Sequence, residues 1–194
     1  PKVVEFERDL SSYCSVKYAK VVCNGTAALQ LAYLAIGLEP GDVVWTTANT
    51  FVATANAALY CGATVDFVDI DLRTYNLSIN SLKEKLMQAK KDNKLPKLLV
   101  PVHFAGQSCE MKAIWELSKE YGFKVIEDAS HTLGGEYLNK KVGNCEYSDM
   151  AVFSFHPVKM ITTGEGGAIM TNSKDLSDKI ELMRSHGITK DPSN

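Results

Sequence analysis

Short apolar runs with strand-like composition alternate with segments of helical periodicity along most of this 194-residue chain. Such alternation is typical of βαβ units, in which strands lie parallel in one sheet and helices cover its faces. Strands are expected at residues 20–23, 42–46, 64–68, 97–103, 124–127, 150–154 and 168–171. Helices are expected at residues 26–36, 52–60, 79–91, 111–121 and 174–184. The pattern predicts an α/β fold with a mainly parallel sheet, in a chain long enough for one domain.

Both ends of the chain read as incomplete. Val4, Phe6 and Leu10 are spaced as part of a helix whose start is missing, and the first residue is not Met. Residues 191–194 read as a turn with no closing element. We therefore expect a fragment of a longer protein.

The third expected helix shows a clear apolar face. Leu82, Leu86 and Ala89 recur at helical spacing and predict its buried stripe. Asn80 and Ser81 stand near its start, and either could cap it.

The composition argues against several classes of function. The formal net charge is -2, so we expect no binding of nucleic acid or of an anionic membrane. No apolar run approaches the length of a membrane span, and the first residues show no signal-peptide pattern. The five cysteines are widely spaced, odd in number and without a C-x-x-C pair, which favours buried free thiols in a reducing cytoplasm. The four histidines lack metal-ligand spacing, so we expect no metal site.

Asn24-Gly25-Thr26-Ala27 follows the first expected strand and opens a helix. Glycine permits a tight turn, and the free N–H groups of a helix start favour a phosphate, to which Thr26 could add its hydroxyl. The same residues also suit an ordinary helix start with a small capping residue. The segment matches neither the G-x-G-x-x-G nor the G-x-x-x-x-G-K-[ST] pattern.

Lys159 lies between an apolar strand and a turn rich in Thr and Gly. These flanks are unusual for a solvated lysine, although a surface lysine in a loop is the ordinary alternative. Desolvation and nearby positive charge lower the pKa of a lysine and make its amine nucleophilic, as formation of a Schiff base requires.

Asp128 follows the expected strand 124–127, where a carboxylate can pair with the pyridine nitrogen of pyridoxal 5′-phosphate (PLP) or simply cap a turn. Glu127 is expected to point to the other side, because side chains alternate along a strand. A lysine, a carboxylate after a strand and a phosphate-type turn are the three features that a PLP site needs. All three follow expected strands, where open α/β sheets place their ligands.

Three other side chains are candidates for this site. Ser154 lies five positions before Lys159 and could bond a phosphate or cap the turn. His156 could orient the lysine or a substrate, or could make a structural hydrogen bond. Phe51 could stack on a flat ring or belong to the core.

Five ordered motifs resemble the DegT/StrS family of PLP-dependent sugar aminotransferases, which have fold type I. They are N-G-T-A-A-L at 24–29, T-x-x-T-F-V-A-T-A-N-A at 47–57, H-F-A-G at 103–106, E-D-A-S-H at 127–131 and S-F-H-P-V-K-x-I-T-T-G-E-G-G at 154–167. R-S-H-G at 184–187 matches a further family segment. The resemblance implies a three-layer α/β/α domain with a mainly parallel seven-stranded sheet, in which residues 168–171 are antiparallel. Residues 1–194 would be the PLP-binding large domain, without the family's N-terminal arm and C-terminal small domain.

The resemblance also implies roles for individual residues. Lys159 would be the Schiff-base lysine and Asp128 the partner of the pyridine nitrogen, and these two would be the catalytic residues. Phe51 would stack on the ring, and His131 would lie near its hydroxyl. The phosphate end would be held by Gly25, Thr26, Ala27 and Ser154.

The implied reaction moves an amino group from L-glutamate to the C4 keto group of a UDP-linked 4-keto-6-deoxy (N-acetyl) hexose. Such products serve cell-surface polysaccharide, lipopolysaccharide or flagellar glycan biosynthesis. The H-x-x-K-x-I-T-T-G-E-G-G segment is similar to enzymes of the pseudaminic acid and lipid A aminoarabinose branches, and His131 with Gly134 favours the former. Sugar dehydratases of the family carry His in place of the lysine, so Lys159 favours amino transfer.

The family works as a cytoplasmic homodimer with shared sites, so the fragment alone could be inactive. One alternative is a non-catalytic PLP-fold protein with a regulatory or ligand-sensing role. The presence of both Lys159 and Asp128 argues against it, because a sensor need not keep both. A doubly wound nucleotide-binding domain without PLP is a third hypothesis, supported by the sheet pattern alone.

Overall fold

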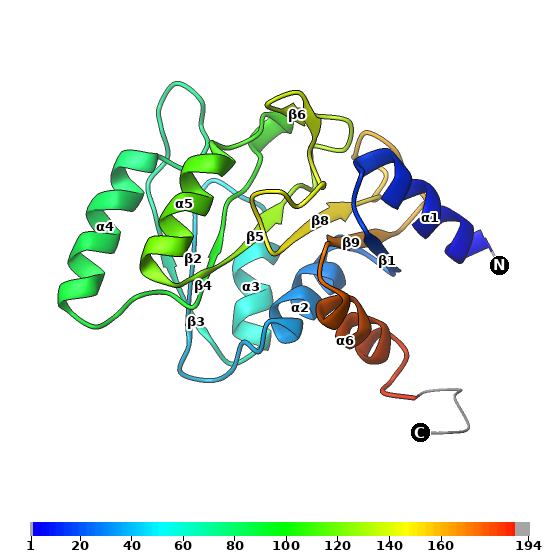
Figure 1. Ribbon diagram of the computed structural model, residues 1–194, viewed down its shortest axis with the longest axis horizontal. Helices are drawn as coiled ribbons and strands as arrows, with labels where there is room; N and C mark the ends of the chain where they lie inside the picture. Colours follow the sequence, from blue (N-terminus) through cyan, green and yellow to red (C-terminus); the bar gives the residue numbers. More distant parts are fainter. Residues whose placement is uncertain (1, 189–194) are drawn as a thin grey trace.

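A mixed seven-stranded sheet forms the centre of the structure, a computed structural model that describes residues 2–188 (Figure 1). The strands are β1 (Tyr18–Val22), β2 (Val43–Thr46), β3 (Thr64–Phe67), β4 (Leu98–Val100), β5 (Lys124–Asp128), β8 (Met150–Ser154) and β9 (Gly167–Thr171). They lie in the order β1-β9-β8-β5-β4-β2-β3. Strand β9 is antiparallel to β1 and β8, and the other neighbouring pairs are parallel. The seven expected strands are confirmed, including the antiparallel one.

Helices cover both faces of this sheet, which confirms the three-layer α/β/α architecture (Figure 1). They are α1 (Lys2–Cys14), α2 (Gly25–Ala35), α3 (Ala53–Tyr60), α4 (Ile79–Lys91), α5 (Met111–Tyr121) and α6 (Lys174–Arg184). Helices α2, α3 and α6 pack on one face, while α4, α5 and α1 pack on the other. Within residues 2–188, no helix has the length and apolar character needed to cross a membrane.

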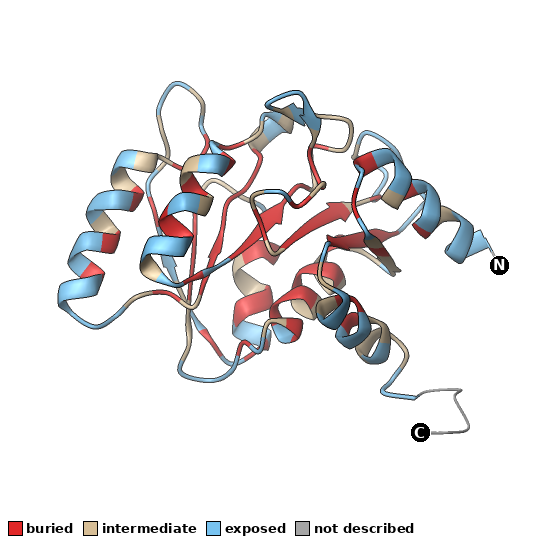
Figure 2. Cartoon of the chain, viewed as in Figure 1, coloured by how far each residue is buried: buried red, intermediate tan, exposed pale blue. Residues whose placement is uncertain are grey.

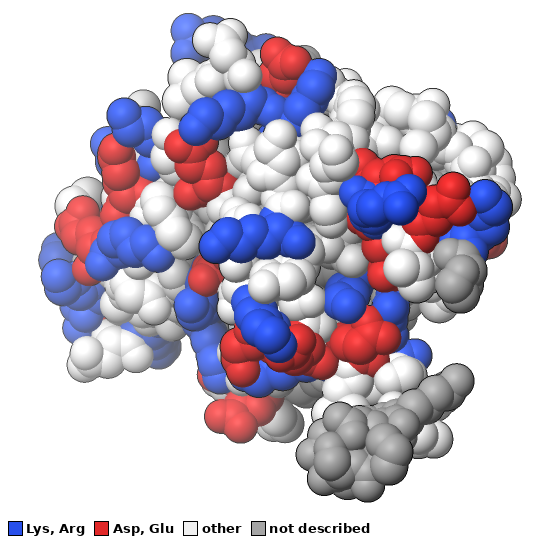
Figure 3. All heavy atoms as spheres, turned by 45° about the vertical axis from the view of Figure 1, so that its right-hand side comes forward, with Lys and Arg blue, Asp and Glu red and all other residues white. Residues whose placement is uncertain are grey.

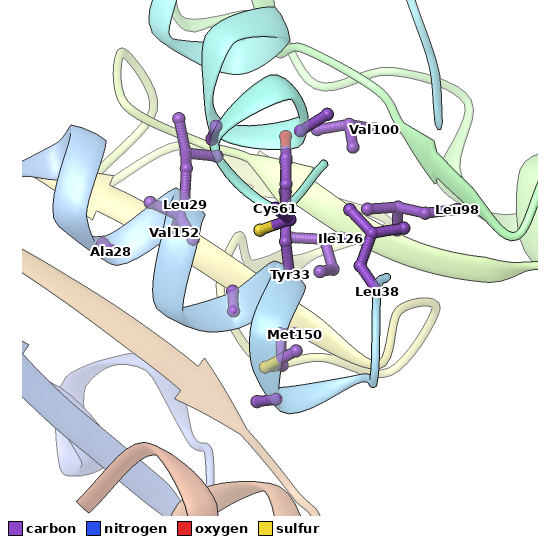
Figure 4. Close-up of a cluster of buried hydrophobic side chains, with 14 of the residues drawn as sticks. Ala28, Leu29, Tyr33, Leu38, Cys61, Leu98, Val100, Ile126, Met150 and Val152 are labelled. Carbon is purple, nitrogen blue, oxygen red and sulfur yellow. The ribbon is translucent and has the colours of Figure 1, made fainter. Parts of the chain in front are cut away.

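The core is divided into two sides by the alternation of side chains along each strand. Ile126 and Val152 pack in one cluster with Tyr33 of α2 (Figure 4). Their chain neighbours Val125 and Phe153 face the opposite side, toward α4 and α5 or toward α1. Figure 2 accordingly shows buried central strands between helices whose outer faces are exposed. This arrangement makes the sheet a rigid support for the loops at its ends.

Two local expectations were wrong. The strand expected at 97–103 ends at Val100, because Pro101 follows and has no N–H to continue a ladder. The N-cap of α4 is Ser78, whose side chain accepts the N–H of Ser81, and not Asn80 or Ser81. The expected buried stripe of α4 is confirmed: Leu82, Leu86 and Ala89 are its buried residues.

Three other features complete the comparison with the sequence. A hairpin of β6 (Glu136–Tyr137) and β7 (Lys140–Lys141) was not expected. All five cysteines are free thiols, but Cys23 is exposed and only the other four are buried. The turn expected at 191–194 lies outside the described residues.

Arg184, near the end of the described chain, ties α6 to the N-terminal part of the fold. Its guanidinium donates to the Glu7 carboxylate of α1 and, at 2.9 Å, to the carbonyl of Val21 in β1. Glu7 also accepts the N–H of Val21 at 2.9 Å. The R-S-H-G segment therefore begins with a residue that joins three elements.

Acidic and basic side chains are interspersed over the surface drawn in Figure 3, and that face shows no extended area of a single sign.

Candidate active site

A pocket of about 430 Å³ opens at the carboxyl ends of the parallel strands, beside α2 and α3. Its walls come from the loops that follow β1, β2, β4, β5 and β8. The lining residues that the sequence singled out are Gly25, Thr26, Phe51, Asp128, His131, Ser154, His156 and Lys159. His103 and Phe104 of the H-F-A-G motif also line the pocket, so the topology brings together residues from all five quoted motifs, at the edge where open α/β sheets bind ligands.

The N-terminus of α2 forms one end of the pocket. The Asn24 side chain caps the helix by accepting the N–H of Ala27 at 2.8 Å. This bond occupies the Ala27 amide, and Ala27 does not line the pocket. Gly25 and Thr26 belong to the first turn, whose N–H groups have no acceptor within a helix, and both line the pocket. This end suits an anion, because the N–H groups and the positive end of the helix dipole both face it.

Close backbone packing fixes the position of this turn. A Cβ on Gly167 would lie 2.5 Å from both the carbonyl carbon and the carbonyl oxygen of Asn24, and 2.8 Å from the amide nitrogen of Gly25. A Cβ on Gly25 would in turn lie 3.0 Å from Cβ of Ser154. Only glycine allows β9 and the α2 turn to approach this closely. The Ser154 hydroxyl is therefore held directly beside the first turn of α2.

The Asp128 carboxylate lies at the end of β5 on the side of α2 and α3, and it is buried. One oxygen accepts the Thr54 hydroxyl at 2.7 Å, and the other accepts the N–H of Ser130 at 3.2 Å. A carboxylate has about four lone-pair sites, so acceptor capacity remains on the side of the pocket. Asp128 thus caps a turn and lines the pocket at the same time.

Thr54 was quoted within a motif, but the sequence analysis gave it no role. Its single hydroxyl proton goes to Asp128, so the 2.8 Å contact with Thr50 requires the Thr50 hydroxyl to donate. The two threonines form a chain of hydrogen bonds that ends on the carboxylate. The signal available in the sequence was a single threonine within the alanine-rich segment that forms α3.

Lys159 lies in the loop between β8 and β9, half-buried at the pocket wall. Burial lowers the pKa of its amine below the ordinary value, although the charge of Asp128 opposes the shift. The pKa of His131 is also lowered, first by burial and then by the charge of Lys159, again against Asp128. Relative to exposed side chains, both shifts raise the fraction of free amine at Lys159 and of neutral imidazole at His131.

The outer part of the pocket is open and apolar. Phe51 is 69% exposed and therefore not a core residue, and Val158 is 76% exposed. Ring nitrogen Nδ1 of His156 accepts the N–H of Val158 at 3.3 Å, so this histidine does make a structural hydrogen bond. The outer wall therefore presents flat and apolar groups with few partners of their own.

Other lining residues received no individual role in the sequence analysis, although three of them stand in the quoted motifs. Asn49, Phe104, Ser130 and Glu165 come from loops that carry no strand or helix signal. Their positions depend on tertiary structure, as for the Phe104 N–H, which donates to the side chain of Asn76 at 2.9 Å.

Comparisons with known proteins agree with this geometry. The chain is 49% identical to a UDP-4-amino-4,6-dideoxy-N-acetyl-beta-L-altrosamine transaminase of Campylobacter jejuni, over 97% of this chain and 48% of the relative. It is 45% identical to a GDP-perosamine synthase of Caulobacter vibrioides, over 96% of this chain and 48% of the relative. The chain thus spans about half the length of the curated relatives it matches.

A solved structure of Helicobacter pylori PseC, an aminotransferase involved in the biosynthesis of pseudoaminic acid, superimposes with a TM-score of 0.89 at 38% identity. The match covers 100% of this chain and 51% of that one. The model of the DegT/DnrJ/EryC1/StrS aminotransferase family matches residues 1–194. The chain therefore belongs to the DegT/DnrJ/EryC1/StrS aminotransferase family.

Proposed function

We propose that this chain is the PLP-binding large domain of a nucleotide-sugar aminotransferase. The observation that carries the proposal is the convergence of Lys159, Asp128 and the first turn of α2 on one pocket of about 430 Å³. Phosphate, pyridine ring and aldehyde are the three parts of PLP that need a partner, and the pocket offers a suitable group for each.

The donor set of the pocket fits PLP. Gly25, Thr26 and Ser154 would hold the phosphate at the start of α2, where Gly167 allows the backbone to approach. Ala27 would support this turn through its bond to Asn24. At the other end, Asp128 would accept the proton of the pyridine nitrogen.

The remaining contacts would come from the outer wall and from the loop after β5. Phe51 would stack on the ring, and His131, favoured as neutral, would bond the ring hydroxyl. When bound, PLP supplies an electron sink for bonds broken at the carbon next to the amine.

Lys159 would hold the cofactor covalently through its amine and would move protons during amino transfer. Burial lowers its pKa, so a larger fraction of its amine is free at neutral pH than for an exposed lysine. A freed amine at this wall can take a proton from one carbon and return it to another. Lys159 and Asp128 are therefore the proposed catalytic residues.

The proposed reaction takes the amino group of L-glutamate and passes it to the C4 keto group of a UDP-linked 4-keto-6-deoxy hexose. A relative named as a UDP-sugar transaminase at 49% identity supports this choice, and a GDP-perosamine synthase at 45% makes GDP the competing nucleotide. The product would serve cell-surface polysaccharide, lipopolysaccharide or flagellar glycan biosynthesis in the cytoplasm, as in the pseudaminic acid branch.

We also propose that the whole protein acts as a homodimer. Phe51 and Val158 line the pocket and are exposed, and the exposed apolar residues Val52, Met160 and Ile161 stand close to them in the chain. Contiguous exposed apolar groups mark association surfaces. A second subunit placed here would cover the open side of the pocket and exclude water from it.

Borohydride trapping after incubation with PLP, followed by peptide mass mapping, tests the first part of the proposal. A reduced phosphopyridoxyl adduct on Lys159 is the expected result. An adduct spread over exposed lysines such as Lys83 and absent from Lys159 would reject the assignment of this pocket.

A second experiment separates an enzyme from a regulatory or ligand-sensing protein. Glutamate should bleach the absorbance of the bound cofactor and release 2-oxoglutarate in equal amount. Stable binding without any response to glutamate would favour the non-catalytic alternative. UDP- and GDP-linked 4-keto sugars, offered in parallel to the aminated protein, would then identify the nucleotide.

A further inference from the structure

His103 is a fully buried titratable residue to which the proposed reaction assigns no role. It opens the H-F-A-G segment just after β4. Both ring nitrogens are engaged: Nδ1 accepts the N–H of Cys109 at 3.1 Å, and Nε2 lies 2.7 Å from a carboxylate oxygen of Glu127. Because Nδ1 is an acceptor, the proton of the ring lies on Nε2 and points to Glu127.

Glu127 is the residue next to Asp128 and faces the opposite side of the sheet, as the alternation of β5 predicted. Its second oxygen accepts the Ser148 hydroxyl at 2.5 Å. The carboxylate is 5% exposed, so His103 and Ser148 are its partners in a buried environment. A buried carboxylate that loses such a partner is strongly destabilised and is drawn toward water.

The backbone of His103 also holds the loop that follows β5. Its N–H donates to the carbonyl of Asp128 at 3.1 Å, and its carbonyl accepts the Thr132 hydroxyl at 3.2 Å. The neighbouring Gly106 approaches the carbonyl of His131 so closely that a Cβ there would lie 3.1 Å from it. The H-F-A-G segment therefore contacts residues 128, 131 and 132 of the segment that carries Asp128 and His131.

We propose that His103 is a positioning residue, whose link to Glu127 fixes the end of β5 so that the Asp128 carboxylate faces the pyridine nitrogen of the cofactor. This inference rests on the proposed function. The end of β5 is held by hydrogen bonds on both faces of the sheet. His103 and Ser148 bond the Glu127 carboxylate on one face, and Thr54 bonds the Asp128 carboxylate on the other. Releasing Glu127 turns the strand end, and Asp128 moves with it.

Two substitutions separate the contributions of the hydrogen bonds made by the two ring nitrogens of His103. His103→Asn keeps an acceptor at the position of Nδ1 for Cys109 but no longer reaches Glu127. His103→Gln places an amide N–H near the position of Nε2 and is the conservative rescue. Ser118→Ala is the control, because Ser118 is also buried and hydrogen-bonded but lies on α5, away from the pocket.

The measurement compares two probes for each protein: PLP, and the PLP analogue in which a C–H group replaces the pyridine nitrogen. Their affinity ratio reports the contact between Asp128 and that nitrogen. A purely structural loss at His103 would weaken both probes equally and leave the ratio unchanged. Urea unfolding of each variant records the loss of stability separately.

We expect the wild-type protein to prefer PLP, His103→Asn to lose roughly tenfold of that preference, and His103→Gln to recover most of it. Ser118→Ala should lower stability without changing the ratio. An unchanged ratio in His103→Asn would overturn the positioning role while leaving the proposed function intact.

Two results in the wild-type protein would also decide the matter. Equal affinity for both probes would show that Asp128 does not contact the nitrogen, which removes the positioning role but not cofactor binding. Binding of neither probe would overturn the proposed function together with this inference. If His103→Asn does not fold, Ser148→Ala replaces it under the same criterion, because it releases Glu127 from its other partner.

Discussion

The two ends of the pocket are built in different ways. At the inner end, Gly167, Asn24 and Gly25 pack backbone against backbone, with no room for an added methyl group. At the outer end, Phe51 and Val158 are more than two-thirds exposed. The inner end is thus closely packed, whereas the outer end leaves apolar surface exposed. Affinity for a phosphate should therefore depend on the α2 turn and on the Ser154 hydroxyl beside it, and affinity for the ring should depend on the surface that covers the pocket mouth.

The largest effect on activity is expected from a substitution of Lys159 at the pocket wall. Lys159→Ala should lower the rate of amino transfer by at least about a thousandfold, because it removes the proposed covalent attachment and the proposed proton-transfer group. Its amine makes no hydrogen bond to the described residues, so the fold should remain intact. Single-turnover assays with glutamate measure the rate, and circular dichroism checks the fold. Lys83→Ala, on the exposed face of α4, is the control, and retained turnover in Lys159→Ala would contradict the assignment.

Gly167→Ala tests the inner end directly. The new Cβ meets backbone atoms of Asn24 and Gly25, which cannot rotate away as a side chain can, so the α2 turn must shift. We expect PLP affinity to fall on the order of 100-fold, while pyridoxal, which lacks the phosphate, is affected only a few-fold. Fluorescence titration with both compounds measures the difference.

Gly37→Ala is the matched control for this prediction. Gly37 has a φ of +79° and no atom within contact distance of an added Cβ, so the substitution adds strain far from the pocket without a clash. A similar loss of PLP affinity in both variants, or an equal loss for PLP and pyridoxal in Gly167→Ala, would show that the inner end is not set by this packing.

Thr54→Val tests the support of Asp128 on the pocket side. The substitution keeps the side-chain shape but removes the hydroxyl that donates to the buried carboxylate. We expect a loss of about 1–3 kcal/mol in the free energy of unfolding and roughly tenfold in cofactor affinity. Urea unfolding and titration measure the two quantities. Thr171→Val removes an equally buried hydroxyl, which donates to the backbone carbonyl of Asp149 at the other end of the sheet. This control should lower the free energy of unfolding and leave cofactor affinity unchanged.

Phe51→Ala should have the smallest effect on the isolated chain. An exposed aromatic ring contributes little to folding, so the free energy of unfolding should change by less than about 0.5 kcal/mol. Cofactor affinity should fall a few-fold, because one stacking contact is lost. Leu72→Ala, at a position 82% exposed, is the control for loss of exposed apolar surface. A large loss of stability in Phe51→Ala would mean that the outer wall is packed more firmly than its exposure indicates.

The pH dependence of adduct formation compares the half-buried Lys159 at the pocket with an exposed lysine. Because burial lowers the pKa of Lys159, its free amine forms at lower pH than that of an exposed lysine. The yield of the Lys159 adduct should therefore rise at a lower pH than the yield on Lys83, measured by trapping at graded pH. Coincident pH profiles would contradict the lowered pKa.

Periodicity predicted the strands and most helices to within a few residues at most element ends, whereas the antiparallel direction of β9 followed from the family resemblance. It failed where a single residue overrides the pattern, as Pro101 does at the end of β4. Site residues that end strands or open helices, such as Asp128 and Gly25, could be identified because their element places them at the pocket edge.

Residues whose role depends on long-range contacts could not be identified in this way. Thr54 meets Asp128 across 74 positions, and Gly167 meets Asn24 across a strand pair. Neither contact has a local signal, because both arise only when β1, β5, β8 and β9 are assembled in one sheet.

The antiparallel strand β9 also determines when the pocket can form during synthesis. Among the described residues, β9 lies between β8 and β1, and β9 is the one strand that pairs with β1. Residues 18–22 are synthesised before residues 167–171, yet they cannot pair in the sheet until residues 167–171 follow. The α2 turn at residue 25 therefore reaches its final position only after β9 is made. A nascent chain therefore cannot complete both ends of the pocket until residue 171 has emerged.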